Sequence, residues 1–229
     1  MLNAFGPNIW TAEGPVVTAA LGFHYPTRMC VIRLIDDQLF ICSPITLSDA
    51  LSAAITALGQ VRYLIAPNSL HDLYIADWKT AFPEAQIYTA PGLAHKRGDL
   101  VIAGELDDTP PTPWADAMDQ VVMRGNALTE EVVFFHRESA SVIFTDLLQN
   151  MPKGWYKGWR AVIAHLDLMT GDTPRVPRKF RVAFKDKAAA RQALAQITQW
   201  PAHNVLMAHG TPIKGDGQAF IARSFDWLK

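Results

Sequence analysis

A strand–helix–strand run between residues 61 and 89 constrains the fold of this chain more than any other feature. Val61–Ala66 is an apolar run of strand length, and a short turn follows it. A helix is predicted over about His71–Phe82, where apolar residues recur at helical spacing until Pro83 stops it. Gln86–Thr89 then resumes strand. Such short connections join parallel strands through a helix that packs on the sheet, which predicts an α/β fold.

Strand and helix patterns continue on both sides of this unit, and no linker separates them. Two hairpins are predicted, one from Cys30–Ile35 with Leu39–Cys42 and one from Val132–His136 with Ser141–Thr145. We therefore expect residues 1–229 to form one domain. The remaining expected elements are strands at Trp10–Ala20, Gln120–Met123 and Asn204–Ala208, helices from Thr46 (as the cap) to Gly59, at Trp155–Leu168 and at Lys187–Trp200, an exposed connection at Gly92–Pro113 and a basic loop at Gly171–Arg181.

Composition narrows the classes of partner. Hydrophobic residues make up 49 % of the chain and charged residues 19 %, which is ample material for a core. The formal net charge of −1 predicts no bulk attraction to nucleic acid or to an anionic membrane. No apolar stretch approaches the ~20 residues of a membrane span, and the N-terminus shows no secretion signal. Cys30 and Cys42 lie in apolar runs typical of buried free thiols, although they could face each other in a hairpin. We expect a cytoplasmic protein with no nucleic-acid or membrane partner.

Three polar residues share one position, at or just after the end of an apolar strand. His71 follows Val61–Ala66 by a short turn, Asp146 follows Ser141–Thr145, and His209 follows Asn204–Ala208. Ligands of α/β proteins gather beyond the carboxyl ends of the strands, so these side chains could converge. Two histidines and a carboxylate suit zinc with an open position, or non-haem iron. Taken singly, each residue is also explained by capping a helix or a turn.

The motifs around these residues resemble those of the metallo-β-lactamase superfamily over nearly the whole chain. The segment that ends in Pro67-Asn68-Ser69-Leu70-His71 is similar to the superfamily's His-x-His-x-Asp-His motif, with His71 at its last histidine. Phe144-Thr145-Asp146 resembles the segment whose aspartate bridges two metals, and Ala208-His209-Gly210 resembles the late His-Gly motif. The sequence resembles a divergent branch of this superfamily that is classed as a domain of unknown function.

The chain departs from the superfamily pattern at several metal positions. Ala66, Asn68 and Leu70 stand where the first motif has two histidines and an aspartate. Gly125-Asn126 stands where Gly-His is usual, and Cys42-Ser43-Pro44 replaces an Asp-x-Gly turn. A two-metal hydrolase of the usual kind is therefore not expected.

The resemblance implies a four-layer αββα sandwich, with two mixed sheets flanked by helices. It leaves two hypotheses for function. One is a hydrolase of unknown small-molecule substrate that uses one divalent metal, zinc first, held by His71, Asp146 and His209, with Asp146 in the catalytic centre and Asn68 and Asn126 as hydrogen-bond donors to the substrate. The other is a metal-free binding or scaffolding protein. Convergence of the three side chains would favour the metal, whereas histidines that point apart or bind backbone carbonyls would count against it.

Other polar clusters have simpler explanations. His136, Arg137 and Ser139 fit an ordinary hairpin turn, and His165 fits a core histidine. Trp155, Tyr156 and Trp159 fit a core or a pocket wall. The stretch from Arg175 to Lys185 is rich in Arg and Lys, which favours a solvated strand edge over a clamp for an anion. The polar segment from His24 to Arg28 could reach a pocket.

Overall fold

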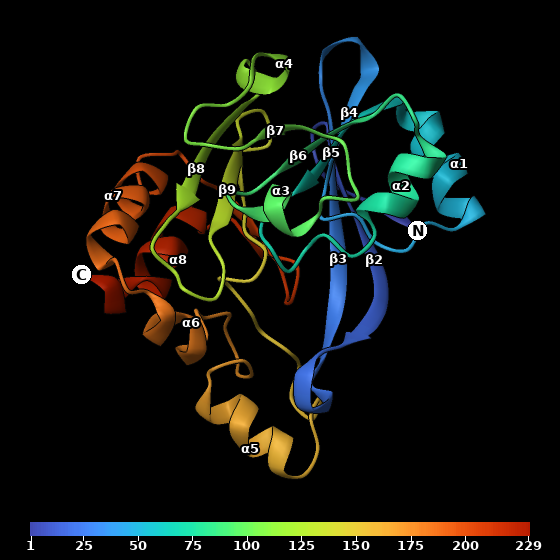
Figure 1. The fold of residues 1–229 in the computed structure, drawn as a ribbon. Helices are drawn as coiled ribbons and strands as arrows, with labels where there is room; N and C mark the ends of the chain where they lie inside the picture. The colour runs from blue at the N-terminus through green and yellow to red at the C-terminus, as the bar shows by residue number, and fades with distance from the viewer.

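Two mixed β-sheets form the centre of the computed structural model, which describes residues 1–229 (Figure 1). In the first sheet the amino-terminal strands are antiparallel and the pairs from β4 to β7 are parallel. In the second sheet only β10 and β11 run parallel. The strand order is β1 (Leu2–Gly6), β2 (Ile9–Thr18), β3 (His24–Arg33), β4 (Gln38–Cys42), β5 (Gln60–Ala66), β6 (Gln86–Thr89), β7 (Ile102–Glu105) in the first sheet and β12 (Ile213–Lys214), β11 (Asn204–Leu206), β10 (Ser141–Ile143), β9 (Glu131–His136), β8 (Met118–Met123) in the second.

Helices lie on the outer face of each sheet. Helices α1 and α2 contact β5, whereas α7 contacts β8 and α8 contacts β11 and β12. None of the helices combines the length and the apolar composition that a membrane span requires. The helices are α1 (Asp49–Leu58), α2 (Ile75–Ala81), α3 (Leu93–Lys96), α4 (Thr112–Ala115), α5 (Trp159–Leu166), α6 (Arg178–Ala183), α7 (Lys187–Ile197) and α8 (Gly217–Ser224), with short 3-10 turns at Ala20–Gly22, Ile35–Asp37 and Asp226–Leu228.

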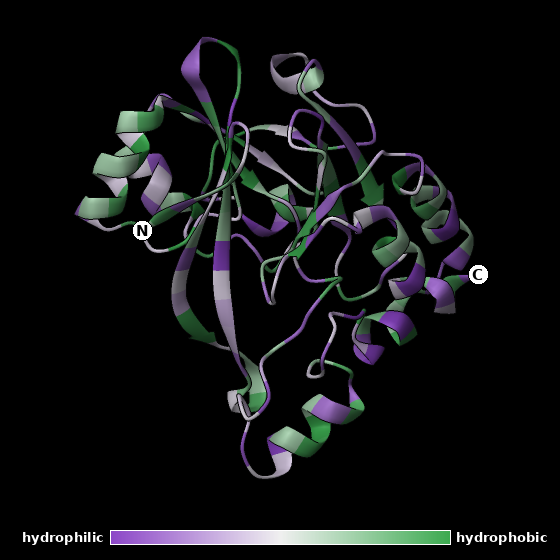
Figure 2. Ribbon diagram, turned by 180° about the vertical axis from the view of Figure 1, so that it is seen from behind, coloured by the Kyte–Doolittle hydropathy of each residue, from purple (hydrophilic) through white to green (hydrophobic).

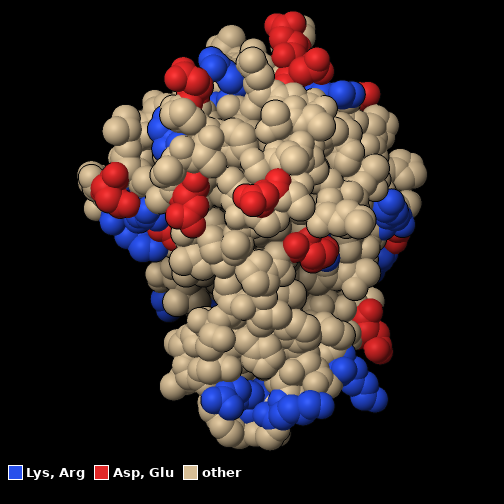
Figure 3. Space-filling view, turned by 90° about the vertical axis from the view of Figure 1, so that its right-hand side faces the viewer, with Lys and Arg blue, Asp and Glu red and all other residues tan.

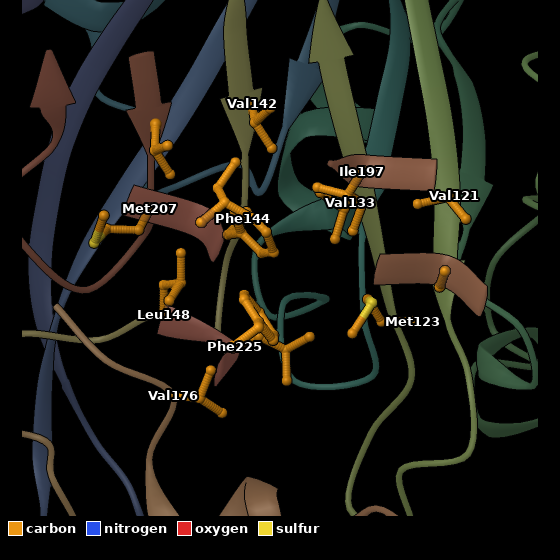
Figure 4. Close-up of a cluster of buried hydrophobic side chains, with 14 of the residues drawn as sticks. Val121, Met123, Val133, Val142, Phe144, Leu148, Val176, Ile197, Met207 and Phe225 are labelled. Atoms are coloured by element: carbon orange, nitrogen blue, oxygen red, sulfur yellow. The ribbon is translucent and has the colours of Figure 1, made fainter. Parts of the chain in front are cut away.

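Three apolar layers hold these four layers of structure together. The middle layer lies between the sheets, where Phe40 of β4 meets Phe134 of β9 edge to face at 5.3 Å. An outer layer joins the first sheet to α1 and α2 around buried Trp78. The other joins the second sheet to α7 and α8, with Phe144 stacked on Phe225 (Figure 4). The four-layer α/β sandwich expected from the resemblance is confirmed.

The first hairpin explains the environment of both cysteines. Cys30 of β3 lies directly opposite Cys42 of β4, as the hairpin pattern allowed. Both are buried free thiols. Burial raises the pKa of each thiol, so neither is disposed to form a thiolate.

Several predicted boundaries were wrong for local reasons. Helix α2 begins at Ile75, so His71 lies in a turn and not at a helix start. The cap of α1 is Ser48 and not Thr46, because the Ser48 hydroxyl accepts the Leu51 N–H at 3.2 Å. The connection after Gly92 contains α3 and β7, whose short lengths give little periodic signal.

The segment after β10 differs most from expectation. Helix α5 is shorter than predicted, and both His165 and Trp159 are exposed on it, so neither belongs to the core. The basic stretch forms helix α6 and not a strand edge, and Pro177 is the N-cap residue of this helix.

Candidate metal centre

The carboxyl ends of β5, β10 and β11 bring the three strand-end residues to one point between the sheets. One ligand atom from each of His71, Asp146 and His209 can be chosen so that all three lie within 4.8 Å of one another. His71 Nε2 lies 3.1 Å from Asp146 Oδ2, and His209 Nε2 lies 3.3 Å from Asp146 Oδ1. All three side chains are nearly buried, with at most 8 % of any of them exposed. The three residues that the sequence singles out therefore lie together in the structure.

Each histidine is held from behind through its Nδ1 atom. His209 Nδ1 lies 2.6 Å from the Pro26 carbonyl oxygen, and His71 Nδ1 lies 2.5 Å from Ser43 Oγ. The Pro26 carbonyl can only accept, so His209 carries a proton on Nδ1 and, when neutral, presents the Nε2 lone pair to the centre. His209 does bind a backbone carbonyl, the contact expected to count against a metal, but the bond uses Nδ1 and leaves Nε2 directed at Asp146.

Ser43 occupies a strained backbone conformation. Its φ of 56° lies in the left-handed region, which residues with a side chain rarely adopt. Such strain costs of order 1–3 kcal/mol and persists where the surroundings impose it. Here it places the hydroxyl of Ser43, directly after β4, against His71. The replaced Asp-x-Gly turn thus contributes an orienting contact.

Two amides support the carboxylate of Asp146. Asn68 Nδ2 donates to Oδ2 at 2.9 Å, and Gln149 Nε2 donates to Oδ1 at 3.1 Å. The other amide atom of Gln149, Oε1, is buried and has no hydrogen-bond partner. A buried carbonyl oxygen without a donor is costly, so this atom marks a place for a donor that the chain does not supply.

Glu131 supports the site and is not predicted from the sequence. It is fully buried, and it accepts the backbone N–H groups of Thr145, Asp146 and Leu147 at 2.9, 2.7 and 3.1 Å. Its carboxylate also lies 3.3 Å from Asn68 Nδ2. Glu131 therefore fixes the loop that carries Asp146.

Arg28 was also missed as a support of the site, although its segment was noted as one that could reach a pocket. Its guanidinium donates to the carbonyl oxygens of Met207 and Gly210, on either side of His209. Tyr25 of the same strand lines the cavity next to His209. The segment from His24 to Arg28 is thus part of β3 and anchors the His209 loop.

The electrostatics favour a charged Asp146. Burial would raise its pKa, but His71 and His209 hold that pKa well below its usual range. Burial would lower the pKa of His71, but the Asp146 carboxylate outweighs burial and raises it. Burial and the negative charge of Asp146 raise the pKa of Glu131, although the hydrogen bonds that Glu131 accepts from backbone N–H groups lower it. Asp146 is thus held in its ionised form, which is the form in which a carboxylate binds a metal.

Neither asparagine faces the adjoining cavity. Asn68 lies within the polar network, where its donors serve Asp146 and Thr145. Asn126 lies away from it, with Nδ2 donating to the Phe180 carbonyl and Oδ1 accepting the Leu128 N–H. Both side chains already bond within the protein, which removes the geometric basis for assigning them to the substrate.

A cavity of about 250 Å³ opens onto the three residues. Asp146, His71, His209 and Gln149 form its polar end. Its walls are mainly apolar, with Val17, Leu70, Leu73, Tyr74 and Phe180 among them. A volume near the lower limit for ligand sites admits a small molecule, bound by apolar contact and oriented at the polar end.

Comparison with known proteins agrees with this geometry. A family model described as a domain of unknown function, DUF4336, matches residues 7–168. No curated protein matches the sequence. Among solved structures, a metallo-β-lactamase from Pontibacter korlensis is 14 % identical with a TM-score of 0.64, covering 100 % of this chain and 98 % of its own.

Two further structures have the same fold. The metallo-β-lactamase FIM-1 from Pseudomonas aeruginosa in its mono-zinc form is 14 % identical with a TM-score of 0.62, covering 100 % of this chain and 94 % of its own. The metal-soaked flavodiiron core Flv1 from Synechocystis sp. PCC6803 is 10 % identical with a TM-score of 0.66, covering 100 % of this chain and 60 % of its own. At these identities the likeness establishes the metallo-β-lactamase fold.

Proposed function

This chain belongs to the DUF4336 family and has the metallo-β-lactamase fold, and we propose that it is a metallo-hydrolase-like protein that holds one divalent metal through His71, Asp146 and His209. The observation that carries the proposal is the convergence of these three donors at one end of a cavity. Two imidazoles and one carboxylate leave a position open, which is the arrangement of catalytic rather than structural zinc sites. Zinc is the first choice, and iron suits the same donor set.

The donor set fits a metal in this structure for two reasons. Both histidines are anchored through Nδ1 and turn Nε2 inward, as metal-binding histidines do when the second nitrogen is bound elsewhere. The unpartnered Oε1 of Gln149 lies beside Asp146, where it can accept a hydrogen bond from water or substrate. A bound metal would use the two Nε2 atoms as ligands, and water or substrate at the centre would supply the donor that Gln149 Oε1 lacks.

The chemistry divides between the metal and the chain. A bound divalent metal lowers the pKa of water and polarises a carbonyl or phosphoryl oxygen. Asp146 supplies the negative charge that retains the cation, and Asn68 and Glu131 hold that carboxylate and its loop in place. The apolar walls would contact the substrate, and the cavity volume limits the substrate to a small molecule. In this proposal Asn68 positions Asp146, and neither Asn68 nor Asn126 contacts the substrate.

A metal-free binding or scaffolding protein is the second candidate. Asp146 already contacts both imidazoles at hydrogen-bond distance, so the three side chains can satisfy one another without an ion. Four ligands of the usual two-metal site are also replaced in this sequence. In this state His71, Asp146 and His209 would hold the strand ends together, and the cavity would bind a ligand without catalysing a reaction.

Metal content separates the two candidates. The untagged chain, purified without chelator, is analysed by plasma mass spectrometry beside His209→Ala and beside His203→Ala, which removes an exposed histidine outside the site. We expect close to one equivalent of zinc or iron in the wild type and in His203→Ala, and less than about a tenth in His209→Ala, since one lost ligand weakens such sites severely.

The converse result is equally clear. A wild-type chain with less than about a tenth of an equivalent, unchanged after zinc, iron or manganese is added back, would exclude the metal proposal and leave the binding protein. A metal retained in His209→Ala would place the ion elsewhere. A positive result directs the search for activity to small esters, lactams and phosphodiesters, whose reacting bonds a single metal can polarise.

A further inference from the structure

The charges of this chain are unevenly distributed. Residues 151–185 carry a net charge of +6, whereas the other 194 residues carry −7, so the overall value of −1 conceals a strongly basic segment. Most of its basic side chains are exposed. The segment contains two acidic residues, Asp167 and Asp172, against eight basic ones: Lys153, Lys157, Arg160, Arg175, Arg178, Lys179, Arg181 and Lys185.

Helix α5, within this segment, carries its apolar stripe on the outside. Trp159, Val162, Ile163 and Leu166 recur at the spacing of one helix face, and they are 51, 60, 47 and 56 % exposed. Such a stripe normally faces a core. Here Ala164 is the only buried residue of the helix. Figure 2 shows the apolar residues along this outlying helix.

The tip of the β2–β3 hairpin extends this apolar surface. Arg160 Nε donates to the Leu21 carbonyl oxygen at 2.8 Å, and the rings of Phe23 and Trp159 lie 5.8 Å apart, edge to face. Leu21 itself is 74 % exposed. The hairpin tip (residues 19–23) and the segment from Trp155 to Leu166 together form a projection, here called the α5 lobe, at the lower end of the molecule in Figure 1.

Basic residues surround the apolar stripe. Lys153 and Lys157 precede α5 and are exposed, and Arg178 follows it on α6. The backbone N–H of Arg178 donates to the Asp167 carbonyl, which joins the start of α6 to the end of α5. Figure 3 shows Lys and Arg side chains gathered at the lower end of the molecule.

We propose that the α5 lobe docks on the surface of an anionic lipid bilayer. An apolar helix face with a tryptophan, flanked by Lys and Arg, is the pattern of helices that lie in the plane of the membrane interface. The stripe enters the boundary between headgroups and acyl chains, and the basic side chains bind lipid phosphates. A second copy of the chain is a poor occupant, because two lobes of positive charge repel each other. The expectation of no membrane partner rested on the net charge of the whole chain, in which the negative charge of the other residues cancels the positive charge of this segment.

Vesicle binding tests the proposal in the full chain as isolated, and it requires neither metal nor substrate. Flotation is measured with vesicles of phosphatidylcholine alone and with vesicles that also contain about 30 % phosphatidylglycerol. We expect binding to the anionic vesicles only, weakened by salt. Val162→Asp and the double variant Lys153→Glu/Lys157→Glu should each bind at least about tenfold more weakly, because the first removes apolar insertion and the second removes charge attraction.

Val101→Asp is the matched control, since Val101 is 85 % exposed outside the lobe and its replacement introduces the same charge. Circular dichroism establishes that every variant is folded. Failure of the wild type to float with anionic vesicles would overturn the proposal, as would equal binding by Val162→Asp and Val101→Asp. A concentration-dependent dimer that Val162→Asp abolishes, without vesicle binding, would assign the lobe to self-association. Binding of the lobe to an acidic polypeptide, without vesicle binding, would assign it to a protein partner.

Discussion

At the scale of single residues, His136 shows how this fold treats a buried imidazole that forms no ion pair with a carboxylate. His136 ends β9, is 2 % exposed, and bonds through Nδ1 to Ser139 Oγ at 2.8 Å. Burial lowers the pKa of His136, although the charge of Glu138 opposes this. The same residue type is thus kept neutral here, whereas His71 is stabilised in its charged form by Asp146.

The lowered pKa of His136 makes stability fall on acidification. In the unfolded chain the imidazole binds a proton near its ordinary pKa, whereas the folded protein accepts it only at lower pH. The stabilisation is therefore complete above pH ~6.5 and is lost as pH falls through the folded pKa, at about 1.4 kcal/mol per unit of displacement. We expect His136→Gln to lose less unfolding free energy than the wild type between pH 7.5 and 5, measured by urea denaturation.

His203→Gln is the control for this comparison, because it replaces an exposed histidine. It should retain the wild-type dependence of unfolding free energy on pH. An identical pH dependence in His136→Gln and the wild type would show that His136 does not couple folding to protonation.

Whether a residue of the candidate site could be found from the sequence depends on which end of a strand it lies at. His71, Asp146 and His209 could be found from the sequence because each follows the carboxyl end of an apolar strand. Glu131 could not, because it lies at the amino end of β9, and only the antiparallel pairing of β9 with β10 brings that end to Asp146. Asn126 was placed by motif position alone, and the Phe180 carbonyl holds it elsewhere.

At the scale of elements, helix α1 separates what periodicity can predict from what it cannot. Its end at Gly59 agrees with the prediction. Two hydroxyl residues, Thr46 and Ser48, precede it, and helical spacing does not distinguish between them. The structure selects Ser48, whose extended backbone directs Oγ to the Leu51 N–H. Strands β5 and β6, which contain buried residues, were similarly evident, whereas β7, in which no residue is buried, was not.

This assignment predicts unequal effects of two similar substitutions. Ser48→Ala leaves a first-turn N–H of α1 without its acceptor and should lower the unfolding free energy by about 1 kcal/mol. Thr46→Ala removes an exposed hydroxyl that caps nothing and should change it by less than about 0.5 kcal/mol. Thermal or urea denaturation of both variants measures the difference. Equal losses, or a larger loss in Thr46→Ala, would contradict the cap at Ser48.

At the scale of the whole molecule, the candidate site and the α5 lobe share one end of the sandwich. Tyr25 and Lys179 line both the cavity of the metal centre and a second cavity of about 440 Å³. The second cavity is also lined by Phe23, Ile163 and Leu166, which belong to the lobe. A molecule held at a lipid surface through the lobe would therefore have its cavity close to that surface. Residues 151–185 are positively charged and the rest of the chain is negatively charged. An anionic surface would therefore attract the lobe and repel the rest of the molecule, which gives this orientation.

The middle apolar layer also makes the two sheets depend on each other, and this tests whether residues 1–229 fold as one unit. Phe134→Ala in β9 removes the ring that meets Phe40 of the first sheet, at an expected cost of about 3–5 kcal/mol. If the sheets unfold together, hydrogen exchange should become faster by the same free energy in peptides from β3–β5 and from β9–β11. Phe82→Ala, a half-buried ring on the outer side of the first sheet, controls for loss of aromatic bulk and should cost less. Faster exchange in the second sheet alone would mean that the two sheets are separate folding units, because a shared core transmits the loss of stability to both.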